Sequence, residues 1–247
     1  MSWLDATIAT PLIGVTIEPH YSKSVRFRDG LAPLLDELQT ECGEVTIGGS
    51  DSTFSTEVET PKGFSYSIRP DNLLVRFRYR SSLEAKPGKF PQYKFEPHEV
   101  QPYTELLSRV AKETTRLLHA LTREAGTLSV LRIGIVASSR IDAEHVPPGI
   151  ARHVDHFRLP WNANLAKCQA LLLVPLRKDE NGEDRCHHHF EYAPLDKPGE
   201  MEVKLDWQRF PQKPYEAKSE TEPRFLFEAC EAASAYFERV GDGSLWQ

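Results

Sequence analysis

The chain has 247 residues, of which 40% are hydrophobic and 27% are charged, and its formal net charge is −6 at pH 7. Such a chain can bury a sizeable core, and its acidic balance argues against a general binder of polyanions, although a local basic patch is compatible with it. The cysteines lie at Cys42, Cys168, Cys186 and Cys230. Their scattered spacing excludes zinc-ribbon and thioredoxin motifs and predicts free thiols.

The sequence contains no stretch that we expect to enter a membrane. No apolar run approaches the roughly 18 residues that span a bilayer. The first residues also lack a basic segment followed by an apolar core, so we expect no secretory signal, a cytoplasmic protein and no membrane partner.

The first third of the chain predicts several short strands. We expect a strand at residues 10–18 and then a short amphipathic helix at 31–38, capped by Asp29 or Gly30 and ending near Gly43. Strands follow at residues 44–47, 54–59, 64–69 and 73–80, separated by glycine and proline turns. Residues 48–52 predict a flexible loop, and residues 86–102 predict a proline-rich loop.

The strongest pattern in the chain is a long helix followed by a buried strand. Apolar side chains and one threonine recur at helical spacing at Tyr103, Leu106, Leu107, Val110, Thr114, Leu117, Leu118 and Leu121. This stripe predicts an amphipathic helix at 102–126 that Gly126 ends. Glu105 and Arg109 are spaced to pair on its exposed side. The β-branched run at 130–138 then predicts a largely buried strand.

The second half repeats this order of elements. We expect a short helix at 147–157, a buried strand at 171–176, a hairpin turn at 179–182 and strands at 186–192 and 202–209. An amphipathic helix at 224–240 follows, and Gly241 and Gly243 predict its end.

Each half therefore reads as a strand, a short helix, several antiparallel strands and a long helix. This order predicts an α+β fold with two pseudo-repeated halves, at residues 1–127 and 128–247, packed as one compact unit. In each half, the long helix covers one face of an antiparallel sheet. The other sheet face is then partly open, and such a face is a usual place for a partner or ligand.

Two resemblances follow from these stretches. The element order resembles two-repeat saddle proteins of the TATA-binding-protein type, which implies a geometry and no function. The strand at 10–18, the helix sequence YTELLSRVAK and the stretch LRIGIVASSRID resemble an uncharacterised, sporadically distributed family of prokaryotic proteins of similar size. That resemblance implies an accessory gene on mobile or defence-related loci and supplies no catalytic residues.

A basic segment lies near the end of the first group of strands. Arg76, Arg78 and Arg80 alternate with apolar and aromatic residues, so on a strand their guanidinium groups share one face. Together with Tyr79 and Lys94 they are candidates for binding a nucleic-acid backbone or an acidic surface. The alternative is a solvated face whose arginines pair with acidic residues of adjacent strands.

The run from Cys186 to Tyr192 reads CHHHFEY, and alternation on a strand divides it between two faces. One face would carry Cys186, His188, Phe190 and Tyr192 towards the core. The other would carry His187, His189 and Glu191, a ligand set that divalent metals accept. A metal site would need further ligands, for which His153 and His156 are candidates. The alternative is an exposed strand face without metal.

No motif for a specific chemistry is present. Ser138, Ser139, Asp142 and His145 lack the G-x-S-x-G signature of a hydrolase, and the chain has no P-loop, G-x-G-x-x-G or H-E-x-x-H motif. We therefore expect a non-enzymatic protein-binding or scaffold subunit without a cofactor, whose partner is another protein encoded nearby. Two alternatives remain open: a nucleic-acid-binding subunit that uses the arginine segment, and a metal-dependent hydrolase that uses the histidine run.

Overall fold

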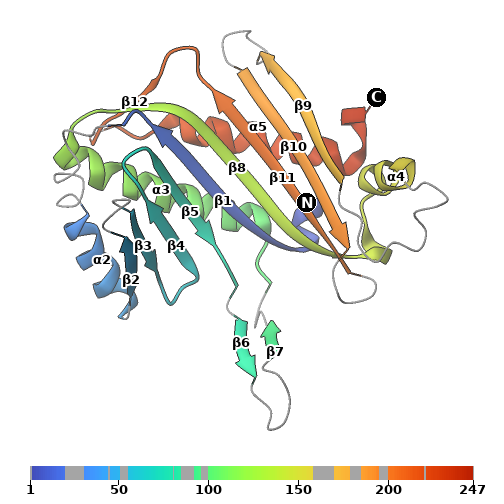
Figure 1. The fold of residues 1–247 in the computed structure, drawn as a ribbon, viewed down its shortest axis with the longest axis horizontal. Coiled ribbons are helices and arrows are strands. Elements are labelled where there is room, and N and C mark those ends of the chain that lie inside the picture. The colour runs from blue at the N-terminus through green and yellow to red at the C-terminus, as the bar shows by residue number, and fades with distance from the viewer. Residues whose placement is uncertain are drawn as a thin grey trace.

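The computed structural model describes residues 2–19, 31–43, 45–50, 55–79, 81–84, 92–95, 100–157, 170–178, 185–194, 200–219 and 221–246. Within these residues, ten strands form one antiparallel sheet, and the long helices cover one of its faces (Figure 1). The predicted α+β class is therefore confirmed.

The sheet has the strand order β2-β3-β4-β5-β1-β8-β11-β10-β9, and β12 also pairs with β8. Strands of the first half are β1 (Ile8–Ile17), β2 (Thr46–Ser50), β3 (Ser55–Glu59), β4 (Phe64–Ile68) and β5 (Asn72–Phe77). Strands of the second half are β8 (Leu128–Asp142), β9 (Ala170–Lys178), β10 (Arg185–Pro194), β11 (Glu200–Phe210) and β12 (Tyr215–Ala217). A separate hairpin of β6 (Ser81–Glu84) and β7 (Gln92–Phe95) projects from the body (Figure 1).

The described helices accompany this sheet, and the two longest lie behind it in the view of Figure 1. The described helices are α2 (Ala32–Cys42), α3 (Tyr103–Ala125), α4 (Pro148–Phe157) and α5 (Arg224–Asp242), with short 3-10 turns η1 (Trp3–Ala6), η4 (Ala143–His145) and η6 (Ser244–Trp246). Helix α3 packs on β1 and β5, α5 packs on β8 and β11, and α4 packs on α5. Among the described residues, no helix has the length and apolar character needed to cross a membrane.

The two halves meet at the pairing of β1 with β8, so a single sheet runs through both. Gly14 lies opposite Gly134, and the neighbouring pairs are Ile13 with Ile135 and Val15 with Ile133. An Ile-Gly segment therefore occurs at the same place in both strands, which run in opposite directions. The pseudo-repeat of the halves stays a prediction.

Helix α3 buries the stripe that its sequence predicts. Its fully buried members include Leu106, Val110, Leu117, Leu118 and Leu121. Thr114 also belongs to the stripe, and its hydroxyl donates to the carbonyl oxygen of Val110 at 2.8 Å, so this buried polar group is satisfied. Gly126 follows the helix with a φ of 78°, a conformation that glycine adopts without strain.

The side chain of Arg109 differs from the sequence prediction. Its Nη1 donates to Oε1 of Gln101 at 2.5 Å, and its guanidinium lies 5.1 Å from the ring centre of Phe64. The predicted pair with Glu105 is replaced by these contacts, because packing against the aromatic ring of β4 draws the arginine towards the sheet.

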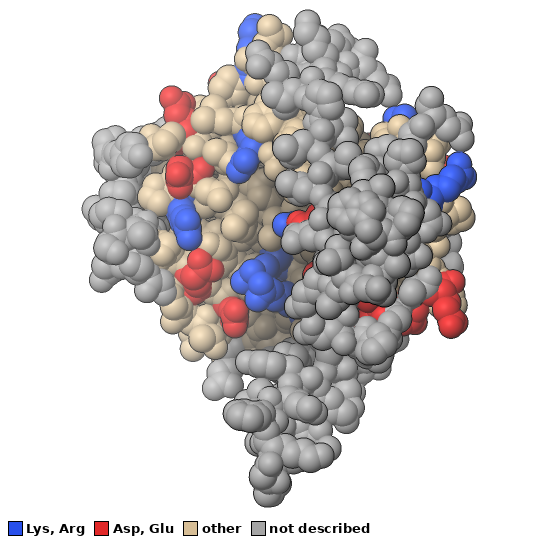
Figure 2. Space-filling model, turned by 45° about the vertical axis from the view of Figure 1, so that its right-hand side comes forward, with Lys and Arg blue, Asp and Glu red and all other residues tan. Residues whose placement is uncertain are grey.

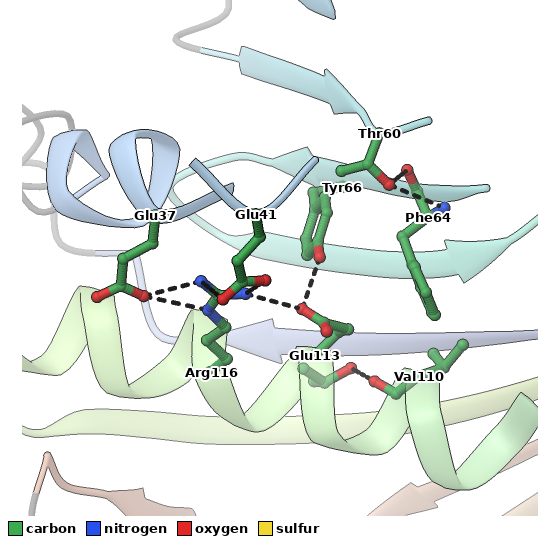
Figure 3. A network of polar contacts seen from close by, with 9 residues as sticks. Glu37, Glu41, Thr60, Phe64, Tyr66, Val110, Glu113 and Arg116 are labelled. Carbon is green, nitrogen blue, oxygen red and sulfur yellow. Dashed lines mark hydrogen bonds and ion pairs between the residues drawn. The ribbon is translucent and has the colours of Figure 1, made fainter. Parts of the chain in front are cut away.

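A polar network joins α2 and α3 to the sheet (Figure 3). Arg116 of α3 contacts Glu37 at 2.9 Å and Glu41 at 3.0 Å, both on α2. On the preceding turn of α3, Glu113 accepts a hydrogen bond of 2.7 Å from the hydroxyl of Tyr66 in β4. The network therefore links three elements that are far apart in the sequence.

The N-terminal turn is fastened to α5. Trp3 donates from Nε1 to the carbonyl oxygen of Phe237 at 2.9 Å. Its ring lies against Gly241, where a Cβ atom would be only 2.3 Å from Cδ1 of the ring. The sequence predicts that Gly241 and Gly243 end the helix; α5 continues through Gly241 and ends before Gly243, whose φ is 81°. The glycine at 241 instead permits close packing.

Three further elements differ from the sequence prediction. Strand β2 continues through the expected loop, because its glycines pair with β3 opposite Glu57 and Thr56. The β6–β7 hairpin lies partly in the expected proline-rich loop, and the short strand β12 adds to one end of β8. The predicted turn at 179–182 and the caps Asp29 and Gly30 lie outside the described residues.

Candidate functional site

The sheet face opposite the long helices is the candidate site. Along β1 and β8 the residues alternate between buried and half-exposed, because successive side chains of a strand point to opposite faces. The buried set packs beneath α3 and α5. The other set lines an open face in which charged residues of both signs lie among uncharged ones (Figure 2).

The centre of this open face is uncharged. Gly14 of β1 and Gly134 of β8 lie opposite each other and carry no side chain. Leu12, Leu74 and Val136 surround them, and all three are half-exposed. We call these five residues the central strip. The side chain of Leu74 packs over Gly14, where its Cδ2 would be 3.0 Å from a Cβ atom, and that of Gln208 lies over Gly134, with its Cγ 3.7 Å from such an atom.

A chain of hydrogen bonds crosses three strands beside the central strip. Nε of Arg132 in β8 donates to the hydroxyl of Thr16 in β1 at 3.0 Å, and its Nη1 contacts Oε1 of Gln208 in β11 at 3.5 Å. Gln208 in turn donates from Nε2 to Oδ2 of Asp206 at 2.9 Å. The arginine is therefore held against the sheet by neutral partners. Sequence reasoning missed it, although it is the one charged residue in an apolar run.

The basic segment near Arg76 forms differently from the prediction, which extends its strand to residue 80. Strand β5 ends at Phe77, so Arg78 lies beyond the strand and is exposed, and Tyr79 is held by hydrogen bonds with the backbone of Gln101. Arg80 and the side chain of Lys94 lie outside the described residues. Of the described members of this group, Arg76 lies in a strand of the main sheet, and a nucleic-acid role for the group stays a prediction.

Two glutamates of β3 act on Arg76 at the open face. Its Nε donates to the hydroxyl of Ser65 at 2.7 Å. Burial, followed by the charge of Arg78, lowers the pKa of Arg76, and the carboxylates of Glu57 and Glu59 oppose that shift. The two carboxylates of β3 thus act on Arg76 across β4, and the solvated strand face that the sequence offers as the alternative stays a prediction.

The histidine run divides between the two faces as its alternation predicts. Cys186, Phe190 and Tyr192 are buried beneath α5, and His188 stacks on the ring of Tyr236 with 4.2 Å between ring centres. The remaining members, His187, His189 and Glu191, are half-exposed on the open face.

The metal hypothesis is not supported by a ligand cluster in the described part of the chain. Nowhere in that part do three or more His, Cys, Asp or Glu residues lie together as metal ligands. Nε2 of His189 and Oδ1 of its cross-strand neighbour Asp206 are buried and have no hydrogen-bond partner among the described residues. His153 and His156 lie on α4, but their side chains are outside the described set, so metal binding by this run stays a prediction.

Ser139 of β8 is held by a hydroxyl partner and not by the nearby acid and histidine. Ser139 is buried, and its hydroxyl donates to the hydroxyl oxygen of Thr7 at 2.6 Å. Asp142 and His145 are exposed, with Oδ2 and Nδ1 4.0 Å apart. They border a hollow of about 790 Å³ at the end of the sheet, together with Thr7 and Arg140. The hydroxyl of Ser139 thus has Thr7 as a structural partner in place of a general base.

The fold and this face together define an α+β protein with an open antiparallel sheet surface. Comparison with protein-family models finds no family that matches the chain, and a search of curated proteins finds no matching relative. The function must therefore be argued from the face itself.

Proposed function

We propose that this chain is a non-enzymatic protein-binding subunit that holds another protein, encoded beside it, against the open face of its sheet. The observation that carries this proposal is the central strip. Leu12, Leu74 and Val136 remain half-exposed around Gly14 and Gly134, on a broad face that the helices leave uncovered. An apolar centre within a polar rim is the usual composition of a surface that binds proteins.

The charges around the central strip favour a protein over a nucleic acid. Arg76 has Glu57 and Glu59 near it, and Lys204 of β11 lies directly opposite Glu191 of β10. A nucleic-acid backbone is bound by an excess of cations, because affinity comes from neutralising phosphates. A face with interspersed charges instead suits a partner that carries both signs.

Co-purification tests the proposal directly. The untagged chain is expressed with its flanking genes and examined by size-exclusion chromatography with absorbance at 260 and 280 nm. We expect a second protein to elute with it at a fixed ratio. The variant Val136→Glu places a charge in the central strip and should weaken that complex by about tenfold or more. Val100→Glu makes the same change at an exposed valine outside the sheet and should leave it intact.

The other outcomes contradict the proposal in distinguishable ways. A single clean peak means that no encoded neighbour binds. A single peak with excess absorbance at 260 nm favours nucleic acid, and Arg76→Ala should then reduce a salt-dependent binding signal. A complex that survives Val136→Glu uses a different surface.

A further inference from the structure

Among the described residues, β2 is an edge strand of the main sheet, with a neighbouring strand on one side. It lies at one end of the strand order and pairs with β3 without a break in register. Its sequence, TIGGS, contains no charge and no proline. Natural edge strands usually carry lysine, proline or a bulge, because open backbone groups invite pairing with another chain. An unguarded edge in a native protein therefore indicates a pairing that the protein uses.

The exposed residues of β2 present different chemistry on the two faces of the sheet. Ile47 is 55% exposed, the largest exposed fraction among the large hydrophobic residues of the described chain. It lies opposite Val58, which is buried on the helix side, so Ile47 points to that side as well. Thr46 and Gly48 point to the open face. The edge is thus apolar behind the sheet and polar in front of it.

The open side of this edge is acidic. Thr46 pairs with Glu59 of β3, and Gly48 pairs with Glu57. A Cβ atom placed on Gly48 would meet no atom within 4 Å, so the space beside Gly48 at this edge is open. Glu57 is held in place by a 2.5 Å hydrogen bond from the hydroxyl of Ser67.

We propose that the β2 edge binds an extended segment of a partner protein as an additional strand, a proposal that rests on the protein-binding function above. The residues of the bound segment alternate between apolar and basic. An apolar residue lies beside Ile47, and a Lys or Arg lies beside each of Thr46 and Gly48. Neighbouring strands are about 4.8 Å apart, so the backbone of the added strand lies roughly 10 Å from β3. The side chain of a lysine or arginine on the added strand and that of Glu57 or Glu59 on β3, extended towards each other, together cover that distance. Backbone hydrogen bonds supply affinity, and the alternation supplies specificity.

Charge argues against a second copy of this chain as the occupant. Two β2 strands paired about Gly48 would bring Glu57 and Glu59 of both copies to the same face, with only neutral residues between them. Like charges across an interface are unfavourable, and the net charge of −6 adds to that repulsion. A basic segment of a different protein meets no such repulsion.

A pocket beside the edge offers a further contact. It has a volume of about 310 Å³, begins at Thr46 and is lined also by Glu59, Thr60 and Arg78. The next side chain of the added strand beyond Thr46 would enter it, where an acid and a guanidinium are both present. The edge therefore has a pocket at one end as well as a ladder of backbone groups, as in other sites that bind peptides by strand addition.

A short fluorescein-labelled peptide that alternates lysine and valine tests this inference by fluorescence anisotropy. We expect binding that weakens as salt increases, and about tenfold weaker binding of a matched peptide that alternates glutamate and valine. Ile47→Lys should reduce binding of the first peptide by about tenfold, because it places a charge at the apolar position of the edge. Leu131→Lys, the same kind of change at an exposed residue of β8, should not.

The results separate this inference from the proposed function. Equal binding of both peptides, no binding, or binding unaffected by Ile47→Lys overturns the inference. Sedimentation that shows a dimer of the wild type, dispersed by Ile47→Lys, overturns it in favour of a second copy. A co-purified partner that is lost with Val136→Glu and retained with Ile47→Lys overturns the edge inference alone. Absence of any partner overturns the proposed function.

Discussion

Removal of the Tyr66 hydroxyl tests how strongly the network of Figure 3 fastens the sheet to α3. Tyr66 is 1% exposed, and its hydroxyl donates to Glu113 at 2.7 Å. Tyr66→Phe deletes this one oxygen and leaves the ring packing unchanged. A hydrogen bond to a charged acceptor contributes about 1.5–3 kcal/mol. The side chain of Glu113 is 25% exposed, so water recovers part of that loss. We expect unfolding in urea to show a loss of about 1–2 kcal/mol.

Tyr103→Phe provides the matched control. Tyr103 is also 1% exposed, but its hydroxyl has no hydrogen-bond partner among the described residues. Removing an unpartnered buried hydroxyl should leave the free energy of unfolding unchanged or raise it. Equal losses for Tyr66→Phe and Tyr103→Phe would refute the reasoning, since the hydrogen bond to Glu113 would then contribute nothing.

The wild type and Tyr66→Phe should also differ in how their stability responds to alkaline pH. Burial, followed by the negative charge of Glu113 and the hydrogen bond to it, raises the pKa of Tyr66 above its ordinary value of 10.0. Because the pKa of Tyr66 is higher in the folded than in the unfolded state, its contribution to stability is complete below pH 10 and is lost as the pH rises above that value. The stability difference between wild type and Tyr66→Phe should therefore shrink above about pH 10. A constant difference up to pH 11 would contradict this cause.

Three further changes have expected outcomes. Arg116→Met should lower the free energy of unfolding by about 1 kcal/mol at low salt and by less at high salt. The loss is modest and salt-dependent because the partners Glu37 and Glu41 are 52% and 51% exposed. An equal loss at high salt would show that Arg116 acts through packing instead. Gly241→Ala should lower the free energy of unfolding by about 1–3 kcal/mol in thermal or urea unfolding, because the methyl group of the alanine overlaps the ring of Trp3. An unchanged melting temperature would show that the ring moves freely. Burial raises the pKa of the Cys230 thiol to about 12, so this thiol should not react with a disulfide reagent at about pH 8. The reagent should therefore label the folded wild type and Cys230→Ser to the same extent. A lower extent of labelling in the variant would show that the Cys230 thiol is accessible.

Local patterns predict the elements that bury a regular stripe, and they fail where pairing between distant strands decides the structure. The helical stripe of α3 and the alternation of β10 could be read directly, because each is set by its own residues. The glycines of β2 indicate a loop when taken alone, and only pairing with β3 makes them a strand. The three residues of β12 are too few to carry a pattern.

The candidate face could be predicted as a surface but not as a set of residues. An open sheet face follows from the order of elements. The meeting of Gly14 with Gly134, and of Arg132 with Thr16 and Gln208, depends on register between strands far apart in the sequence. Arg76 and Arg78 illustrate the same limit, because the end of β5 separates two residues that alternation alone would place together.

The position of β1 between β5 and β8 also bears on how the protein is made. Strand β8 begins at Leu128, about 110 residues after the end of β1 at Ile17, so β1 leaves the ribosome well before β8. At a synthesis rate of about 5–20 residues per second, one side of β1 stays unpaired for roughly 5–20 seconds in every new chain. A chain released before residue 128 would keep that apolar edge permanently open. The first half is therefore poorly suited to exist as a separate module, and a gene interrupted between the halves would yield a fragment prone to aggregation.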